Sequence, residues 1–186
     1  MKNIGLCLLL GVLCGCVRIP PGTEAVTGFE VQRYLGTWYE IARLDHIFER
    51  GLTHVSAEYS LKPDGSLRVV NRGFDPKENR WKSVEGRASF VAGPGQGRLR
   101  VSFFRPFYGG YNILALDERD YGYALVCGNS RDYLWILARQ PTLPKAVLDD
   151  LTQQAKALGF NTDALIQVRQ GAPATTAAPA SESRHK

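Results

Sequence analysis

The stretch Gly36-Thr37-Trp38-Tyr39-Glu40-Ile41-Ala42-Arg43 decides the fold of this chain, because it opens the first of a long series of strand-like segments. Gly36 has no side chain, and the indole of Trp38 follows two positions later. Far along the chain, Arg139 ends the last segment of the series. A glycine, an indole and a distant arginine together indicate an aromatic ring held under a cation.

Length and composition indicate one globular unit. The 186 residues fit about one domain, and a hydrophobic content of 44% is enough for a sizeable core. The formal net charge is +5, and the basic residues are scattered among acidic ones instead of forming a block with interleaved aromatic residues. We therefore expect no nucleic-acid partner.

The N-terminus has the pattern of a signal peptide over residues 1–15. Lys2 supplies a short basic region, and the apolar run over residues 4–13 is roughly half of the ~20 residues that a membrane-spanning helix needs. An ordinary secretory signal and a lipoprotein signal both begin in this way, so the residues around the cleavage site decide between them.

Leu13-Cys14-Gly15-Cys16 resembles the lipobox of bacterial lipoproteins, in which a cysteine becomes the lipidated first residue of the mature chain. We predict lipidation at Cys16. A start at Cys14 fits less well, because Leu13 would occupy a small-residue position. Two or more acyl chains give stable membrane anchoring. Val17 follows where inner-membrane retention signals place Asp, so the expected location is the cell outer membrane, with the protein lipid-anchored.

Both ends of the chain are predicted to lie outside the folded domain. Residues 16–28, with Pro20-Pro21-Gly22, have the composition of a lipidated N-terminus and an extended tether. Residues 171–186 are rich in Ala, Pro, Ser and Thr, which predicts a disordered tail. The folded domain is then residues 29–170.

Cys127 is the cysteine left for the folded domain. Cys7 and Cys14 leave with the signal and Cys16 carries the lipid, so no intrachain disulfide is available. Cys127 ends the apolar run over residues 123–127, which predicts a buried structural thiol rather than a nucleophile.

The body of the chain consists of short alternating segments separated by turn residues. Residues 55–61 alternate strictly, stop at Pro63-Asp64-Gly65 and resume over residues 67–73, which predicts a β-hairpin. Further strands are expected at residues 81–91, 97–104, 111–117, 121–127 and 133–139. With the strand from Trp38, these make about eight strands in hairpin order, which suits an up-and-down barrel wide enough for one small ligand.

A helix is expected after these strands. Thr142 suits the N-cap, Pro144 the first turn, and Gly159 the position just past the end. An apolar stripe between them predicts packing against the outside of the barrel, and it consists of Val147, Leu148, Leu151, Ala155 and Leu158. A short strand is expected at residues 164–168.

This series of strands, helix and short strand resembles the lipocalin family. Its first signature is matched by Gly36-Thr37-Trp38-Tyr39, its second by the turn over residues 116–123, and its third by Arg139. Residues 34–43, 103–112 and 124–137 are similar to bacterial outer-membrane members of the family. The resemblance implies an all-β protein, an eight-stranded antiparallel up-and-down lipocalin barrel with one C-terminal α-helix packed outside.

The resemblance also implies the role of the opening stretch. Trp38 should lie across the closed end of the barrel with Arg139 stacked over it, while the guanidinium reaches backbone carbonyls near Tyr34. We assign Gly36, Trp38 and Arg139 a structural role at this floor.

Function is expected in the cavity above the floor. Strand parity places Val55, Ala57 and Tyr59 on one face, since positions two apart point the same way. A mostly apolar lining favours an elongated apolar guest, although a filled barrel core would show the same pattern. Parity and the resemblance together predict the cavity residues Ala57, Tyr59, Val69, Asn71, Val84, Ala88, Phe90, Val101, Phe103, Tyr111, Ile113, Tyr133 and Trp135.

The segment over residues 103–108 is dense in aromatic side chains. Pro106 and the pair Gly109-Gly110 mark it as a loop or strand end, so it could be the cavity mouth or a surface that docks a partner or the bilayer. Arg105 within it is equally compatible with meeting a phosphate head group and with simple solvation.

The lipocalin resemblance implies a membrane-anchored protein that binds fatty acids, phospholipids or lysophospholipids, and stores or transports them for membrane maintenance. It also suggests a homodimer. A surface or scaffold lipoprotein with a filled barrel is the alternative function.

An enzyme is not expected. His46, His54 and His185 lack metal-ligand spacing, so we expect no metal and no cofactor. A barrel enzyme or a haem protein that uses His46 or His54 is a weaker hypothesis. Asp45, His46 and Glu49 follow the first strand, where the resemblance places a lid loop, and we expect them to be solvated. No Gly-rich phosphate loop or nucleophile elbow is present in the sequence.

Overall fold

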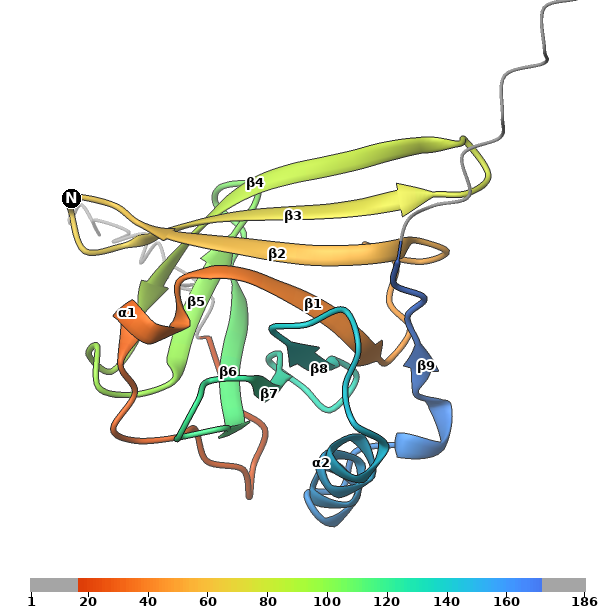
Figure 1. The fold of residues 1–186 in the computed structure, drawn as a ribbon. Coiled ribbons are helices and arrows are strands. Elements are labelled where there is room, and N and C mark those ends of the chain that lie inside the picture. The colour runs from red at the N-terminus through yellow and green to blue at the C-terminus, as the bar shows by residue number, and fades with distance from the viewer. Residues whose placement is uncertain (1–16, 172–186) are drawn as a thin grey trace, which may run out of the picture.

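The computed structural model describes residues 17–171, and all nine strands of this described part belong to one continuous sheet (Figure 1). The predicted signal peptide, the lipidation site Cys16 and nearly all of the predicted tail lie outside the described residues. The elements in chain order are α1 (Val31–Tyr34), β1 (Gly36–Arg43), β2 (Thr53–Leu61), β3 (Leu67–Asp75), β4 (Arg80–Phe90), β5 (Arg98–Ser102), β6 (Gly109–Leu116), β7 (Tyr123–Cys127), β8 (Leu134–Ala138), α2 (Lys145–Ala157), the 3₁₀ turn η1 (Thr162–Ala164) and β9 (Ile166–Gln167).

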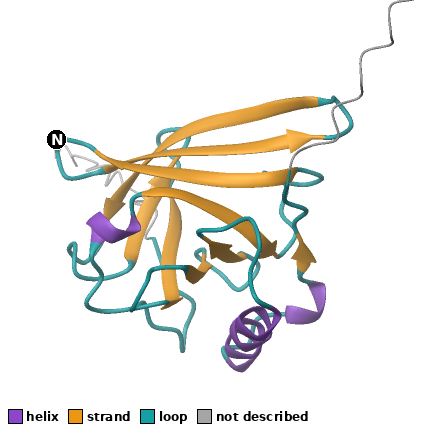
Figure 2. Ribbon diagram, in the orientation of Figure 1, coloured by secondary structure: helices purple, strands orange, loops and turns teal. Residues whose placement is uncertain are grey.

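The sheet closes on itself. Its order is β2-β3-β4-β5-β6-β7-β8-β1-β9, and β1 pairs with β2 as well as with β8. Neighbouring strands are antiparallel throughout, with Trp38 opposite Ala57 and Tyr39 opposite Ala138 on the two sides of β1. The predicted eight-stranded barrel is confirmed, and β9 is a short extra strand on β1. In Figure 2 helix α2 lies below the strands, outside the barrel.

The predicted hairpin turn is present between β2 and β3. Leu61 pairs with Leu67, and Lys62 N donates to Ser66 O over 2.8 Å. The Asp64 carboxylate accepts the Ser66 amide over 3.0 Å, and Gly65 takes the left-handed backbone that a glycine adopts without a steric penalty (φ +77).

Helix α2 packs on the outer face of the barrel, as its apolar stripe predicts. Leu151 and Ala155 are buried in a cluster with Leu125, Leu134 and Ile136 of β7 and β8. A second cluster, described below, lies inside the barrel. The two clusters put apolar side chains on both faces of β7 and β8.

The prediction of Thr142 as N-cap of this helix is wrong. Pro144 occupies the N-cap position, and the helix begins at Lys145. A residue before proline is restricted to extended backbone, so Leu143 is disfavoured in a helix and the first turn cannot start earlier.

One element was not expected from the sequence, and two others have different boundaries. Helix α1 has only four residues, too few to show a helical period. Strand β7 begins at Tyr123, because Tyr121 has a positive φ of 53° and turns the chain. Strand β9 contains only Ile166 and Gln167 of the residues expected there.

Residues 17–28 lie on the barrel, so the prediction of an extended tether is wrong. Val26 N donates to Ile113 O, and Gly97 N donates to Val26 O, each over 2.9 Å. Arg131 Nη2 donates to Pro21 O over 2.6 Å. The backbone of this segment is bound by side chains and strands far away in sequence, which its Pro and Gly content does not reveal.

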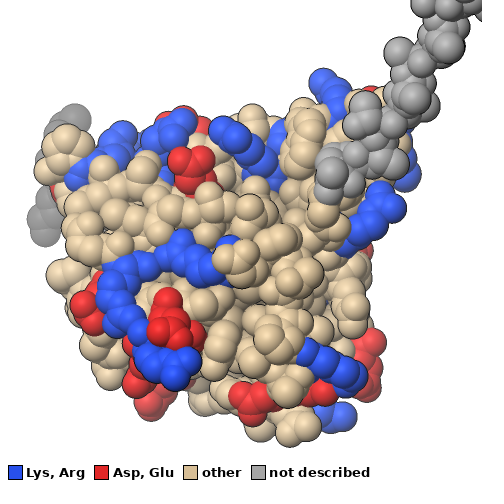
Figure 3. Space-filling view, viewed as in Figure 1, with Lys and Arg blue, Asp and Glu red and all other residues tan. Residues whose placement is uncertain are grey.

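Cys127 is buried with a free thiol, as predicted. Burial raises the pKa of the Cys127 thiol to about 12, so it stays protonated at neutral pH. On the face shown in Figure 3, acidic and basic residues are interspersed. Within the described part of the chain, no helix combines the length and the apolar character needed to cross a membrane.

Candidate ligand-binding cavity

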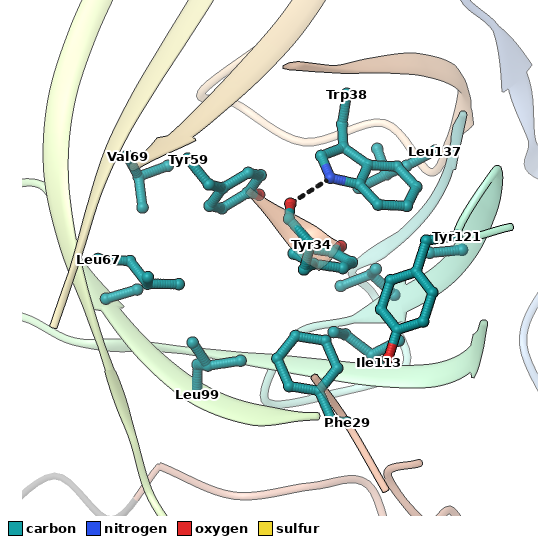
Figure 4. Packing of buried hydrophobic residues seen from close by; sticks show 13 residues of the cluster. Phe29, Tyr34, Trp38, Tyr59, Leu67, Val69, Leu99, Ile113, Tyr121 and Leu137 are labelled. Atoms are coloured by element: carbon teal, nitrogen blue, oxygen red, sulfur yellow. Dashed lines mark hydrogen bonds between the residues drawn. The ribbon is translucent and has the colours of Figure 1, made fainter. Parts of the chain in front are cut away.

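The closed end of the barrel is sealed by Trp38 under Arg139. The guanidinium carbon of Arg139 lies 4.1 Å from the centroid of the Trp38 ring. Trp38 Nε1 donates to Tyr34 O over 2.8 Å, and the two rings stack with centroids 4.5 Å apart (Figure 4). A Cβ on Gly36, whose φ is +89°, would lie 3.5 Å from Arg139 Nη1. Glycine thus allows the left-handed backbone here, whereas a Cβ would meet the cation only at an ordinary van der Waals distance.

Arg139 also ties together three segments of backbone. Its guanidinium donates to the carbonyls of Arg33 (2.6 Å), Thr37 (3.0 Å) and Tyr121 (3.3 Å). The geometry agrees with the structural role expected for this residue, because one side chain fixes α1, β1 and the turn before β7.

Three tyrosine hydroxyls form a polar layer beside the Trp38 ring. The hydroxyls of Tyr34 and Tyr111 are 2.7 Å apart, and Tyr59 donates to Tyr111 over 2.9 Å. Burial raises the pKa of all three phenols well above the ordinary value, so they are neutral hydrogen-bonding groups at physiological pH.

An open cavity of about 790 Å³ lies above the floor, with Trp38 at its base and mostly apolar walls. Val55 and Leu137, which parity also turns inward, belong to these walls. Of the thirteen predicted cavity residues, ten line it, and their contact with a ligand stays a prediction: Ala57, Tyr59, Val69, Asn71, Val84, Val101, Phe103, Tyr111, Tyr133 and Trp135. The size and lining suit one elongated apolar guest.

Ala88, Phe90 and Ile113 do not line the cavity, so their prediction as cavity residues is wrong. They pack in the cluster inside the closed end, where the rings of Phe90 and Phe29 have centroids 6.3 Å apart. Strand parity predicted correctly that these side chains point inward. It could not show that Phe29 and α1 fill the lumen at that depth.

A buried polar cluster lies on one wall of the cavity. Arg43 Nη1 donates to Glu40 Oε1 over 2.6 Å, and its Nη2 donates to Glu49 O over 2.8 Å. Glu49 Oε2 lies 3.0 Å from His46 Nε2 and accepts a hydrogen bond from Trp135 Nε1 over 3.2 Å. Except for Arg43, each of these residues contributes to the cavity wall.

The two carboxyl groups of this cluster have opposite pKa shifts. Burial raises the pKa of Glu40, and the neighbouring Glu49 adds to this while Arg43 opposes it. Burial also raises the pKa of Glu49, but the contacts from His46, Trp135 and Arg43 outweigh it and hold that pKa below the usual value. The contacts around Glu49 therefore favour its charged form, whereas burial disfavours the charged form of Glu40.

The expectation that His46 and Glu49 are solvated is wrong. His46 is buried and the Glu49 side chain is only 13% exposed, because the loop after β1 folds over the barrel opening and its His46 ring packs 5.2 Å from that of Trp135. One sequence signal pointed to the cluster. Glu40 lies two positions after Trp38, so parity turns its carboxylate inward toward a partner.

The sequence of this chain matches a known protein family. A family model described as the lipocalin-like domain matches residues 29–170. The chain belongs to the lipocalin family.

Relatives and solved structures agree with this assignment. The chain is 47% identical to the outer membrane lipoprotein Blc of Vibrio cholerae serotype O1 over 170 residues, which are 91% of this chain and 99% of that protein. It is 51% identical to the outer membrane lipoprotein Blc of Escherichia coli K12 over 161 residues, 87% of this chain and 90% of that one. Insecticyanin from the tobacco hornworm Manduca sexta matches the fold with a TM-score of 0.66 at 20% identity, covering 84% of this chain and 88% of that one.

The mouth of this lipocalin barrel carries large exposed aromatic side chains. Phe48, Phe104 and Phe107 are 72%, 70% and 77% exposed, and each also borders the cavity. The aromatic segment over residues 103–108 is therefore part of the mouth, which is one of the two placements that the sequence left open.

The other histidine of the described residues lies elsewhere in the lipocalin. His54 is buried outside the cavity lining, with Nδ1 2.8 Å from Thr53 Oγ1 and its ring edge-on to Phe74 and Trp81. Within residues 17–171, no group of three or more His, Cys, Asp or Glu side chains is arranged to hold a metal ion.

Proposed function

We propose that this lipocalin is a lipid-anchored protein of the outer membrane that binds fatty acids, phospholipids or lysophospholipids, and stores or transports them for membrane maintenance. The observation that carries the proposal is the open apolar cavity of about 790 Å³ above the Trp38 floor. The outer-membrane location is supported by the names of the two Blc relatives.

The walls of the cavity suit an acyl chain better than a polar ligand. Burial of each methylene contributes about 0.8 kcal/mol, so a chain of ordinary length offsets the cost of leaving the bilayer. The buried cluster of Glu40, Arg43, His46 and Glu49 provides the polar part of the wall. Binding, without a chemical step, accounts for these features.

The first described residues support an anchor beside the mouth. Arg18 N donates to Asn129 Oδ1, and Arg18 O accepts from Asn112 Nδ2, each over 3.3 Å. Asn129 borders the cavity. Consecutive Cα atoms are about 3.8 Å apart, so a lipid on Cys16 would join the protein close to the opening. Lipid would then pass between membrane and barrel over a short path.

The alternative of a filled barrel has less support. A filled core would leave no space of this size above the floor, whereas the closed end, with Phe29 and Phe90, is packed in that way. A homodimer stays a prediction, which analytical ultracentrifugation of the purified protein would check.

Native mass spectrometry of the chain from Val17 onward tests the proposal. We expect one co-purified or added acyl lipid per barrel. An empty barrel that takes up no fatty acid, phospholipid or lysophospholipid would contradict the proposal. A bound chromophore would favour the haem alternative.

Two variants locate the binding. Phe103→Asn places an amide in the cavity wall and should weaken uptake at least tenfold. Val91→Asn is the matched control, because Val91 is exposed and lies outside the cavity lining. Equal uptake by wild type and a folded Phe103→Asn variant would show that Phe103 does not contact the ligand.

A further inference from the structure

A second, smaller depression lies on the outside of the barrel. It has a volume of about 120 Å³ and is lined by Arg87, Ser89, Arg100, Ser102, Arg105 and Tyr108. Arg87 pairs with Ser102 and Ser89 pairs with Arg100 across β4 and β5. Ala88 and Val101 between them belong to the interior, so the alternation of strands turns the four lining side chains outward.

The depression is positively charged. Three guanidinium groups line it, and no carboxylate does. Arg87 is partly neutralised at one side by Asp64, whose Oδ2 lies 2.6 Å away. Among the described residues, Arg100 and Arg105 have no ion-pair partner, and Arg100 lies over the Tyr108 ring at 5.2 Å. Two unneutralised guanidinium groups beside a small hollow favour an anion.

Ser102 supplies an independent observation. The residue is only 7% exposed, and its hydroxyl has no hydrogen-bond partner among the described residues. Buried hydroxyls in proteins are normally paired. An oxygen of an anion in the depression would give this hydroxyl the acceptor that it lacks. Guanidinium and hydroxyl donors around one hollow are the groups that bind the oxygens of a phosphate.

We propose that this depression is a binding site for the phosphate of a lipid head group, separate from the barrel cavity. The surroundings favour a lipid over the free ion. Arg105 lies between the exposed Phe104 and Phe107 at the mouth, and Tyr108 borders both the depression and the cavity. Aromatic side chains can enter the interface of a bilayer while arginines contact its phosphates. The site therefore holds the mouth against the membrane surface.

Amide-resolved NMR of the full lipoprotein in non-ionic detergent tests the site. One titration uses dihexanoyl phosphatidic acid, a short lipid with a phosphate head group, and the other uses inorganic phosphate. We expect the lipid to shift the Ser102 and Arg100 amide signals at a concentration at least tenfold lower than the ion does. Shifts of the Val69 and Trp135 amide signals report binding in the barrel cavity. The experiment therefore shows separately whether ligand binds in the cavity and whether it binds in the depression.

Variants complete the test. Arg100→Gln with Arg105→Gln should abolish the shifts at Ser102, and Ser102→Ala should weaken binding severalfold. Arg80→Gln is the matched control, because Arg80 is exposed on β4 and lies outside the depression. Equal affinity for lipid and inorganic phosphate would overturn the head-group assignment. Absence of shifts at Ser102, or shifts that persist in the double variant, would overturn the site.

Discussion

Single residues stabilise the closed end of the barrel, and Arg139 connects several of its segments. It combines a cation–π contact with hydrogen bonds to three carbonyls from separate segments. Lysine can supply the charge but not the planar fork of donors. The side chain at this position is therefore expected to be specific for arginine.

Arg139→Met should lower the free energy of unfolding by about 2 to 4 kcal/mol, because it removes the cation over Trp38 and several charged hydrogen bonds. Arg139→Lys should recover only part of this loss. Chemical denaturation of both variants measures the difference. If the methionine and lysine variants were equally stable, the guanidinium geometry would not explain the stabilising effect of Arg139 at the floor.

Glu49 predicts a pH dependence of stability. Its pKa is lowered in the folded protein, so its contribution is present above the ordinary carboxyl pKa and is lost as the pH falls through the folded value. At pH 7, Glu49→Gln should cost about 1 to 3 kcal/mol, since a charged acceptor for Trp135 is lost.

Thermal unfolding of Glu49→Gln and wild type at several pH values checks this prediction. The difference in unfolding temperature between the two proteins should decrease as the pH falls below the ordinary pKa of glutamate. Glu24→Gln is the control, since Glu24 is exposed. A gap that is independent of pH would contradict the assigned charge of Glu49.

At the scale of elements, β4 and the chain after β5 pack unusually closely. A Cβ on Gly86 would lie 2.6 Å from the Phe103 ring and 2.9 Å from Ser102 O. The glycine thus lets the aromatic ring lie against the strand, where it forms part of the cavity wall. The shape of the cavity depends on this contact between two elements.

Gly86→Ala should therefore destabilise the protein by about 1 to 3 kcal/mol, as overpacking does, and should change lipid affinity together with stability. Gly95→Ala serves as a control, because a Cβ there meets nothing within 4 Å. Denaturation and lipid titration of both variants give the two readouts. Unchanged stability in Gly86→Ala would show that the Phe103 ring moves away without cost.

At the scale of the whole molecule, the sequence predicts the barrel. It does not predict which segments of the chain fill or cover the barrel. Alternation and turn residues predict strands and hairpins such as the one around Asp64 and Gly65, because these signals are local. The insertion of Phe29, the docking of residues 17–28 and the folding of His46 over the opening depend on contacts far apart in sequence. No local pattern encodes them, and they decide which inward residues border the open space.

The central claim is that an acyl chain lies in this space, and a crystal structure with a terminally brominated fatty acid tests it most directly. Anomalous scattering locates the bromine at the end of the chain. We expect its signal inside the barrel, between Trp38 and the walls formed by Phe103 and Trp135. Bromine found only outside, among the exposed rings of Phe104 and Phe107, would contradict the claim.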